Sequence, residues 1–271
     1  RGIGILLCWE GTGHPFLNRA SYHALAQLER GERLVELRKP EVRAAIISDL
    51  PIDMGEFPNF VTRSWHKMFV SSGAGVLSYE PNSDRSVAAI ATERGCTPEE
   101  VAYDALMAND GRGVLYFPLF NYSGGDLTAL HELLTHPRTR LGLSDAGAHC
   151  GAICDGGMAT FMLTHWSRDR SRGPRIALET IVAMQTAQTA ALYGLGDRGT
   201  VAPGMKADLN LIDYNELKLR MPEMVYDLPT GGRRLVQRAE GYVATICSGQ
   251  VISEHGEPTG AMPGQLIRGG R

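Results

Sequence analysis

The sequence predicts an α/β fold of 271 residues that ends in a small β region. Helix and strand patterns alternate between residues 83 and 193, which is typical of short buried strands covered by helices. After about Gly196 the helical period gives way to strand-like stretches separated by Gly, Pro and Asp turns. We therefore expect residues 1–197 to form part of a (β/α)₈ barrel and residues 198–271 to form a small β domain.

The composition excludes several classes of protein. Apolar residues make up 43% and charged residues 21%, as in ordinary soluble globular proteins. A net charge of −3 gives no electrostatic footprint for nucleic acid, and no apolar window approaches the ~18 residues of a membrane span. The 5 cysteines are widely scattered and odd in number, which argues against a disulfide framework. With no visible secretory signal, we expect a reducing, cytoplasmic setting.

Capping residues and apolar spacing predict the helices. Thr97-Pro98-Glu99-Glu100 is a capping box with proline at the first helical position, and Gly95 is placed to end the helix before it. The expected helices cover 18–30, 41–50, Ser83 or Asp84 to Arg94, 97 to about 109, Asp126-capped 127–135, and 176–193 with Gly194 past its end. Residues 51–83 lack a period and predict long surface connections.

Short apolar runs predict the strands, and polar residues follow two of them. The expected strands cover 2–8, 113–120, 139–143, 208–212, 242–247 and 250–253. The run 113–120 has the near-continuous apolar character of a buried parallel strand. Asn121 and Tyr122 follow it, and Ser144 and Asp145 follow the next strand. Such strand ends carry the chemistry in a (β/α)₈ barrel.

The segment 143–149, Leu-Ser-Asp-Ala-Gly-Ala-His, is the most informative of these strand ends. Its carboxylate, Asp145, leaves a short apolar strand and enters a glycine-containing loop. There it could transfer protons or bind a metal ion. The alternative is that Asp145 braces the loop through backbone N–H groups. His149 is a candidate ligand, substrate contact or simple loop histidine.

Residues 199–213 carry a pattern of glycines, a central Ala-Asp and alternating apolar positions. The residues that fill it are Gly199, Val201, Gly204, Ala207, Asp208, Leu209, Leu211 and Asp213. With Gly249-Gln250-Val251, this pattern resembles the closing β segment of the amidohydrolase superfamily. Segments 141–155, 163–170 and 221–241 are similar to one branch, the D-aminoacylase or N-acyl-D-amino-acid deacylase group.

The resemblance implies the C-terminal part of a metal-dependent (β/α)₈ barrel with an appended small β-sandwich domain. It implies amide hydrolysis by a water activated on zinc or another divalent ion. Asp145 matches the residue that serves as general acid/base beside that metal. The superfamily's His-x-His pair does not occur in this sequence. We therefore expect the metal ligands mostly outside this chain, in an N-terminal half that would precede a start near the sixth strand.

A linear N-acyl amino acid is the substrate that this branch implies, and its carboxylate suits a guanidinium. Arg168, Arg170, Arg172 and Arg175 follow Asp145, although a solvated charge run is the simpler explanation for them. Of these, Arg168 is the candidate contact, with Asn121, Tyr122 and His149. Two other functions stay open: hydrolysis of a cyclic amide, as in hydantoinases and dihydroorotases, and a non-catalytic remnant or subunit.

Overall fold

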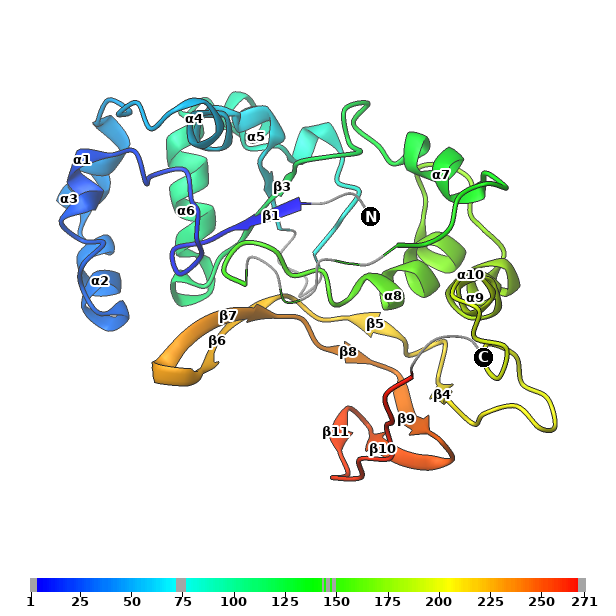
Figure 1. The fold of residues 1–271 in the computed structure, drawn as a ribbon. Helices are drawn as coiled ribbons and strands as arrows, with labels where there is room; N and C mark the ends of the chain where they lie inside the picture. Colours follow the sequence, from blue (N-terminus) through cyan, green and yellow to red (C-terminus); the bar gives the residue numbers. More distant parts are fainter. Residues whose placement is uncertain (1–3, 72–76, 143, 145–146, 148–149, 268–271) are drawn as a thin grey trace.

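The computed structural model describes residues 4–71, 77–142, 144, 147 and 150–267. An antiparallel three-stranded sheet, with β3 as its central strand, lies near the middle of the molecule (Figure 1). Its strands are β1 (Gly4–Leu7), β2 (Phe69–Val70) and β3 (Leu115–Pro118). All residues of β3 are buried, as its apolar run predicted.

The direction of β3 corrects the parallel pairing that its sequence favoured. The strand runs antiparallel to both neighbours, with Tyr116 opposite Leu6 on one side and Phe69 on the other. Its two faces belong to different core clusters, Tyr116 to one and Leu115 and Phe117 to the other. A continuous apolar run reports burial on both faces and carries no information about strand direction, which is why that expectation was wrong.

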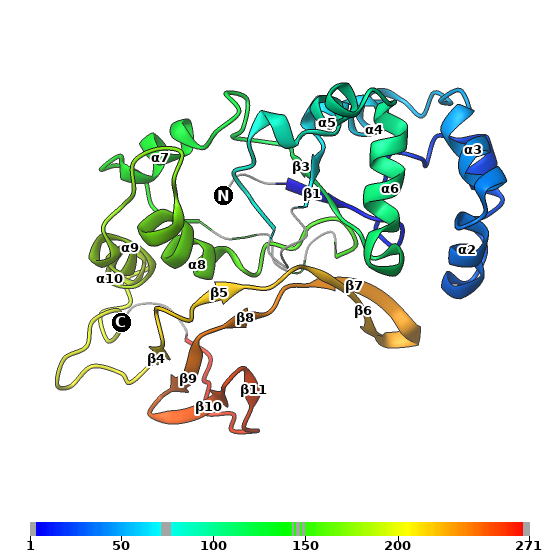
Figure 2. The same cartoon turned by 180° about the vertical axis from the view of Figure 1, so that it is seen from behind.

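Helices flank this sheet in two groups, which Figures 1 and 2 show on opposite sides of it. The first group comprises α1 (Ala20–His23), α2 (Arg30–Leu37), α3 (Pro40–Ser48), α4 (Glu56–Arg63), α5 (Val87–Arg94) and α6 (Pro98–Gly111). The second comprises α7 (Thr128–Thr135), α8 (Met158–Phe161), α9 (Leu178–Gln185) and α10 (Ala187–Leu192). Short 3₁₀ turns cover Trp65–Lys67, Ser83–Arg85 and Pro229–Gly231, and a π-helical stretch covers Met162–Asp169.

The strongest local signals are confirmed. The Thr97 hydroxyl accepts a hydrogen bond from the Glu100 N–H at 3.2 Å, and the Glu100 carboxylate accepts the Thr97 N–H at 2.8 Å. Pro98 opens α6, and Gly95 ends α5 in the left-handed region with a φ of 65°. The helix expected to follow a cap at Asp126 begins one residue later, at Thr128 with Leu127 as its N-cap, and the Asp126 carboxylate accepts the Thr128 N–H at 2.8 Å. Each of these signals acts within one turn of chain, so the sequence alone fixes it.

The helix expected over 18–30 is wrong, because it stops after the single turn of α1. The guanidinium of Arg33 donates hydrogen bonds to the carbonyl oxygens of Ala26 and Leu28, at 3.5 and 3.3 Å. Both carbonyls lie beyond the end of α1, so these bonds hold the turn that connects α1 to α2. The chain turns instead and starts a new helix, α2, at Arg30.

Other boundaries also moved. The helix expected from Ser83 or Asp84 begins at Val87, with Ser86 as its N-cap. The helix expected over 176–193 divides into α9 and α10 at Thr186, whose hydroxyl donates to the Val182 carbonyl at 2.6 Å. Residues 139–142 form no strand, and the unpatterned region 51–83 contains α4.

The C-terminal region is all β in the described residues. The strands expected there are confirmed as β4 (Leu209–Ile212), β9 (Tyr242–Cys247) and β10 (Gln250–Glu254), which join β11 (Glu257–Pro258) in one antiparallel sheet. Two further pairs were not expected: β5 (Lys218–Leu219) with β8 (Ala239–Glu240), and the hairpin of β6 (Glu223–Leu228) and β7 (Gly232–Val236). The described sheets are open, so barrel closure and a sandwich remain predictions.

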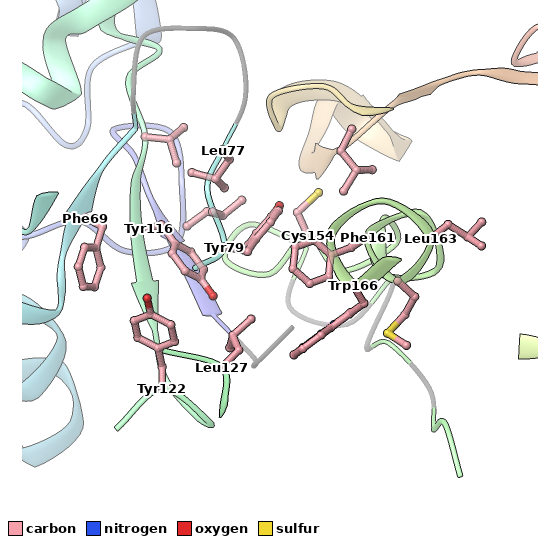
Figure 3. Close-up of a cluster of buried hydrophobic side chains, with 14 of the residues drawn as sticks. Phe69, Leu77, Tyr79, Tyr116, Tyr122, Leu127, Cys154, Phe161, Leu163 and Trp166 are labelled. Atoms are coloured by element: carbon pink, nitrogen blue, oxygen red, sulfur yellow. The ribbon is translucent and has the colours of Figure 1, made fainter. Parts of the chain in front are cut away.

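One core cluster joins the C-terminal strands to the preceding chain. Leu217, Leu219 and Leu235 pack in the same cluster as Phe161 and Trp166. Figure 3 shows the centre of this cluster, where aromatic rings from β3 and from the chain after residue 77 meet the helix that begins at Met158. The boundary at 197/198 thus remains a prediction, and the regions on its two sides share buried side chains. Among the described helices, none has the length and apolarity needed to span a bilayer.

Removing the Thr97 side chain should destabilise the chain through α6 alone. We expect Thr97→Ala to lower the free energy of unfolding by about 1 kcal/mol, because the first turn loses its side-chain cap. Urea unfolding followed by circular dichroism measures it. Thr92→Ala is the matched control: that hydroxyl bonds only the Ala88 carbonyl within α5, so its loss should cost nothing measurable. Equal destabilisation by both substitutions would contradict the capping argument.

Candidate active site

The candidate residues predicted from the sequence differ in whether the structure describes them and in how exposed they are. Asp145 and His149 lie outside the described residues. Asn121 is exposed and has a positive φ of 59°, at the end of the chain segment that leaves β3. Tyr122 is buried, and Arg168 lies in the π-helical stretch. The structure therefore tests none of these roles directly, but it shows what the described side chains already bind.

The best-developed polar cluster in the described chain surrounds Glu80. Arg170 donates two hydrogen bonds to its carboxylate, from Nε to Oε2 and from Nη2 to Oε1, both 3.1 Å long. His165 Nε2 lies 2.9 Å from Oε2, and the Leu127 N–H donates to Oε1 at 2.8 Å. Each carboxylate oxygen thus has two partners, which is what a buried carboxylate needs.

The surroundings determine the protonation state of Glu80. Its side chain is only 3% exposed, and burial by itself raises the pKa of a carboxyl. The hydrogen bonds from His165, Arg170 and the Leu127 N–H outweigh this effect and lower the pKa of Glu80 to about 2. Glu80 is therefore ionised at neutral pH.

Arg170 is equally buried, with a side-chain exposure of 0%. Its guanidinium lies 4.7 Å from the centre of the Trp166 ring and donates a third hydrogen bond, to the Pro174 carbonyl, at 2.7 Å. Bidentate pairing and stacking on an aromatic face are contacts that arginine makes and lysine does not. The solvated charge run suggested by the sequence is thus wrong for this arginine.

Tyr122 and Arg172 connect this cluster to the loop at Pro81. The Tyr122 hydroxyl donates to the Pro81 carbonyl and accepts a hydrogen bond from Arg172 Nη1 at 3.0 Å. Burial raises the pKa of Tyr122 to about 12, so the hydroxyl keeps its proton. Its donor and an acceptor site are already used within the protein, and its proposed contact with substrate remains a prediction.

Arg168 ties the π-helical stretch to the C-terminal region. It donates to the backbone carbonyls of Tyr214 and Leu217, the latter at 2.8 Å, and pairs with Asp169 at 2.7 Å. The guanidinium also lies 5.2 Å from the centre of the Tyr214 ring. These contacts give Arg168 a clear structural task, and its role toward substrate remains a prediction.

Three backbone hydrogen bonds hold the chain that follows the Asp145 loop. The carbonyl of Cys150 accepts the Leu235 N–H at 2.7 Å, and the carbonyl of Ala152 accepts the Leu6 N–H at 2.8 Å. The Gly151 carbonyl accepts the Thr12 N–H at 2.7 Å. Strands β1 and β7 thereby fix the exit of the loop from opposite ends of the sequence.

A cavity of about 840 Å³ opens beside these strands. Its floor includes buried Cys8, Val114, Leu219 and Leu235. Charged side chains surround that floor: Glu10, Arg30, Arg112, Lys218, Arg220, Glu223, Arg238 and Glu240. This volume lies within the ~300–1,000 Å³ range of small-molecule sites.

The described residues do not fit a metal centre. No three His, Cys, Asp or Glu side chains come together in the ranges that the structure covers. Cys8 does not supply a ready thiolate, since burial raises its pKa to about 11. The donors that a zinc site requires are thus not provided by this part of the chain.

The chain belongs to the amidohydrolase family, since residues 6–253 match the family described as Amidohydro_3. Uncharacterised proteins of Mycobacterium bovis and Mycobacterium tuberculosis are 28% identical over 215 residues. That alignment covers 76% of this chain and 35% of theirs, so the chain spans about a third of the length of the curated relatives it matches.

Solved structures of D-aminoacylase were also found. One is described as defining a novel subset of amidohydrolases, and another addresses the role of its binuclear metal centre. They are 26% and 27% identical to this chain, with TM-scores of 0.36. Each match covers 65% of this chain and 33% of the other.

Glu80 is the residue of this region that sequence reasoning missed. It lies in the unpatterned stretch 51–83, and its partner Arg170 is 90 residues away. A single signal was available: a carboxylate beside Tyr79 with no other acid among the preceding 20 residues, and an arginine-rich segment elsewhere in the sequence. That signal does not say which arginine pairs with which acid.

Breaking the Glu80–Arg170 pair should be costly. We expect Arg170→Met to lower the free energy of unfolding by about 3 kcal/mol or more, because it leaves a carboxylate buried without its cation. The double variant Glu80→Gln/Arg170→Met should recover part of that loss, since no buried charge remains. Urea titrations of the wild type and variants measure both values. A double variant less stable than Arg170→Met would contradict this account.

The stability of the protein at acidic pH should also depend on Glu80. The pKa of Glu80 is about 2 when folded and near 4.5 when unfolded, so its stabilising contribution is complete above pH 4.5 and is lost as the pH falls toward 2. The contribution lost is on the order of 3 kcal/mol. Unfolding midpoints at pH 7, 4.5 and 3 should fall more steeply for the wild type than for the Glu80→Gln/Arg170→Met variant. Parallel curves would show that Glu80 does not carry this pH dependence.

Proposed function

We propose that the protein containing this chain hydrolyses the linear amide C–N bond of N-acyl amino acids of the D-series. The observation that carries the proposal is membership in the amidohydrolase family over residues 6–253. The sequence resemblance of 141–155, 163–170 and 221–241 to the D-aminoacylase branch supports the linear substrate.

In this proposal Asp145 is the general acid/base. It removes a proton from the attacking water and delivers that proton to the amine nitrogen as the C–N bond breaks. A carboxylate on a loop suits this task where the scaffold holds the chain beside the loop, because the side chain is then both positioned and accessible. The backbone bonds from Leu6, Thr12 and Leu235 to residues 150–152 support such a fixed loop exit.

Zinc or another divalent ion is part of the same proposal, and it would polarise the amide or activate the water. Because the described residues bring no three donors together, we place its ligands mainly outside this chain. An N-terminal half that supplies them is the proposed partner. We propose no nucleic-acid or membrane partner.

Substrate comparison and one substitution test the function. The protein from its native source should release free amino acid from N-acetyl-D-amino acids and leave hydantoins intact. Asp145→Asn should lower kcat by roughly 10²–10⁴-fold, the range for loss of a general acid/base. Asp84→Asn, at an exposed carboxylate in a 3₁₀ turn, is the matched control and should retain activity.

Two outcomes would overturn the proposal. Preference for the hydantoin would mean a cyclic-amide hydrolase. Turnover of neither substrate by protein whose circular dichroism shows it to be folded, with no effect of Asp145→Asn on any bound ligand, would favour a non-catalytic subunit.

A further inference from the structure

We infer that the 840 Å³ cavity binds an amphiphilic carboxylate, and that in the function proposed above this ligand is an N-acyl amino acid with a medium-length aliphatic acyl chain. The inference rests on that proposed function and extends it, because it assigns the substrate class and the residues that select it. It is carried by the cavity's position, its apolar floor and two unpaired guanidinium groups.

The cavity lies next to the chain that carries the proposed acid/base. Leu235 lines the cavity, and its N–H binds the carbonyl of Cys150, five positions after Asp145. Five residues of extended chain span at most about 18 Å. The backbone contact therefore holds the cavity wall beside the chain that follows the Asp145 segment.

The floor is suited to an aliphatic chain. Val114, Leu219 and Leu235 are less than a tenth exposed, at 6%, 8% and 8%. Met221 and Met224, both half-buried, complete it. Methionine side chains are flexible and polarizable, so they adapt to chains of different length and shape. None of these five side chains forms the strong hydrogen bonds that a sugar or a base would need.

The charges around the floor favour an anion. Five of the lining side chains are cationic and three are carboxylates, although the whole chain carries a net charge of −3. Lys218 and Arg220 share one carboxylate, that of Glu240, at 2.7 and 2.6 Å. Arg238 lies 3.6 Å from Glu223. Two of the three carboxylates that line the cavity, Glu240 and Glu223, are thus paired with cationic side chains.

The third acid is also neutralised, and it does not repel an anion. Glu10 accepts hydrogen bonds from Arg33 at 2.5 Å and from the Tyr226 hydroxyl at 2.6 Å. Two cations of the cavity wall, Arg30 and Arg112, are left without an ion-pair partner in the described chain. Guanidinium groups bind carboxylates through paired, charge-assisted hydrogen bonds.

The apolar floor and the two guanidinium groups together favour one class of ligand. A purely apolar ligand would leave both guanidiniums unused, and a small polar anion would leave the floor in contact with water. An aliphatic chain that ends in a carboxylate satisfies both. The structure therefore favours Arg30 and Arg112 for the carboxylate over Arg168, whose guanidinium is bound to Asp169, Tyr214 and Leu217.

Calorimetric titration of the full chain with three compounds tests the inference. N-octanoyl-D-leucine should bind at least about tenfold more tightly than N-acetyl-D-leucine, because the longer chain buries more apolar surface. It should also bind about tenfold more tightly than N-octanoyl-D-leucinamide, which lacks the carboxylate.

Matched variants locate the binding site. Arg112→Gln should weaken octanoyl-D-leucine binding about tenfold and leave the leucinamide unaffected. Arg94→Gln, at an exposed arginine of α5 that does not line the cavity, should change neither. Equal affinities for the octanoyl and acetyl compounds, or equal affinities of wild type and Arg112→Gln, would overturn the inference.

Hydrolysis measured in the same samples separates this inference from the proposed function. Hydrolysis of N-acetyl-D-leucine at a rate unaffected by chain length or by Arg112→Gln would support the function and overturn the inference. The predicted binding pattern without hydrolysis would support the ligand chemistry of the cavity and count against the hydrolytic function.

Discussion

The buried pair of Glu80 and Arg170 is the constraint on which this region depends. Two charges removed from water are tolerated only when every donor and acceptor finds a partner. Here the partners come from four places in the chain: the segment before Pro81, the N-terminus of α7 at Leu127, the π-helical stretch and the turn at Pro174. Because a shift of any of them would break a hydrogen bond to a buried charge, this pair constrains their relative positions.

Local signals in the sequence predicted local structure well. The capping box at Thr97 and the left-handed glycine at Gly95 depend on neighbours within one turn, so the structure could only confirm them. Predictions of secondary structure failed where they depended on more than the local sequence. The helix expected over 18–30 stops after α1, and Arg33, which lies outside that segment, binds two carbonyls of the turn that follows; no periodicity within 18–30 indicates this contact. The direction of β3 was predicted wrongly for another reason: burial on both faces does not determine strand direction.

The same contrast between local signals and distant contacts applies to the candidate site. Composition and position drew attention to the arginine-rich segment and predicted a strand end at Asp145; residues 139–142 form no strand, and Asp145 lies outside the described residues. The sequence could not assign Arg170 to burial, because its partner Glu80 is 90 residues away and lies in a stretch without a pattern. It could not find the cavity either, since Cys8, Val114 and Leu235 come from three distant segments. The residue types of a candidate site can thus be predicted from sequence, whereas their arrangement in space cannot.

Pairing also explains which cations remain available to a ligand. Arg170 and Arg33 each neutralise a carboxylate in a poorly hydrated place, where an unpaired charge would be most costly. Arg30 and Arg112, which line the cavity, have no ion-pair partner among the residues that the structure describes, and neither is fully buried, so leaving them unpaired is less costly. Burial, rather than position in the sequence, thus separates the structural arginines from the two proposed to bind a ligand. In that proposal an anion meets two guanidiniums that form no ion pair within the described residues, above an apolar floor that the anion can cover only if it carries a chain.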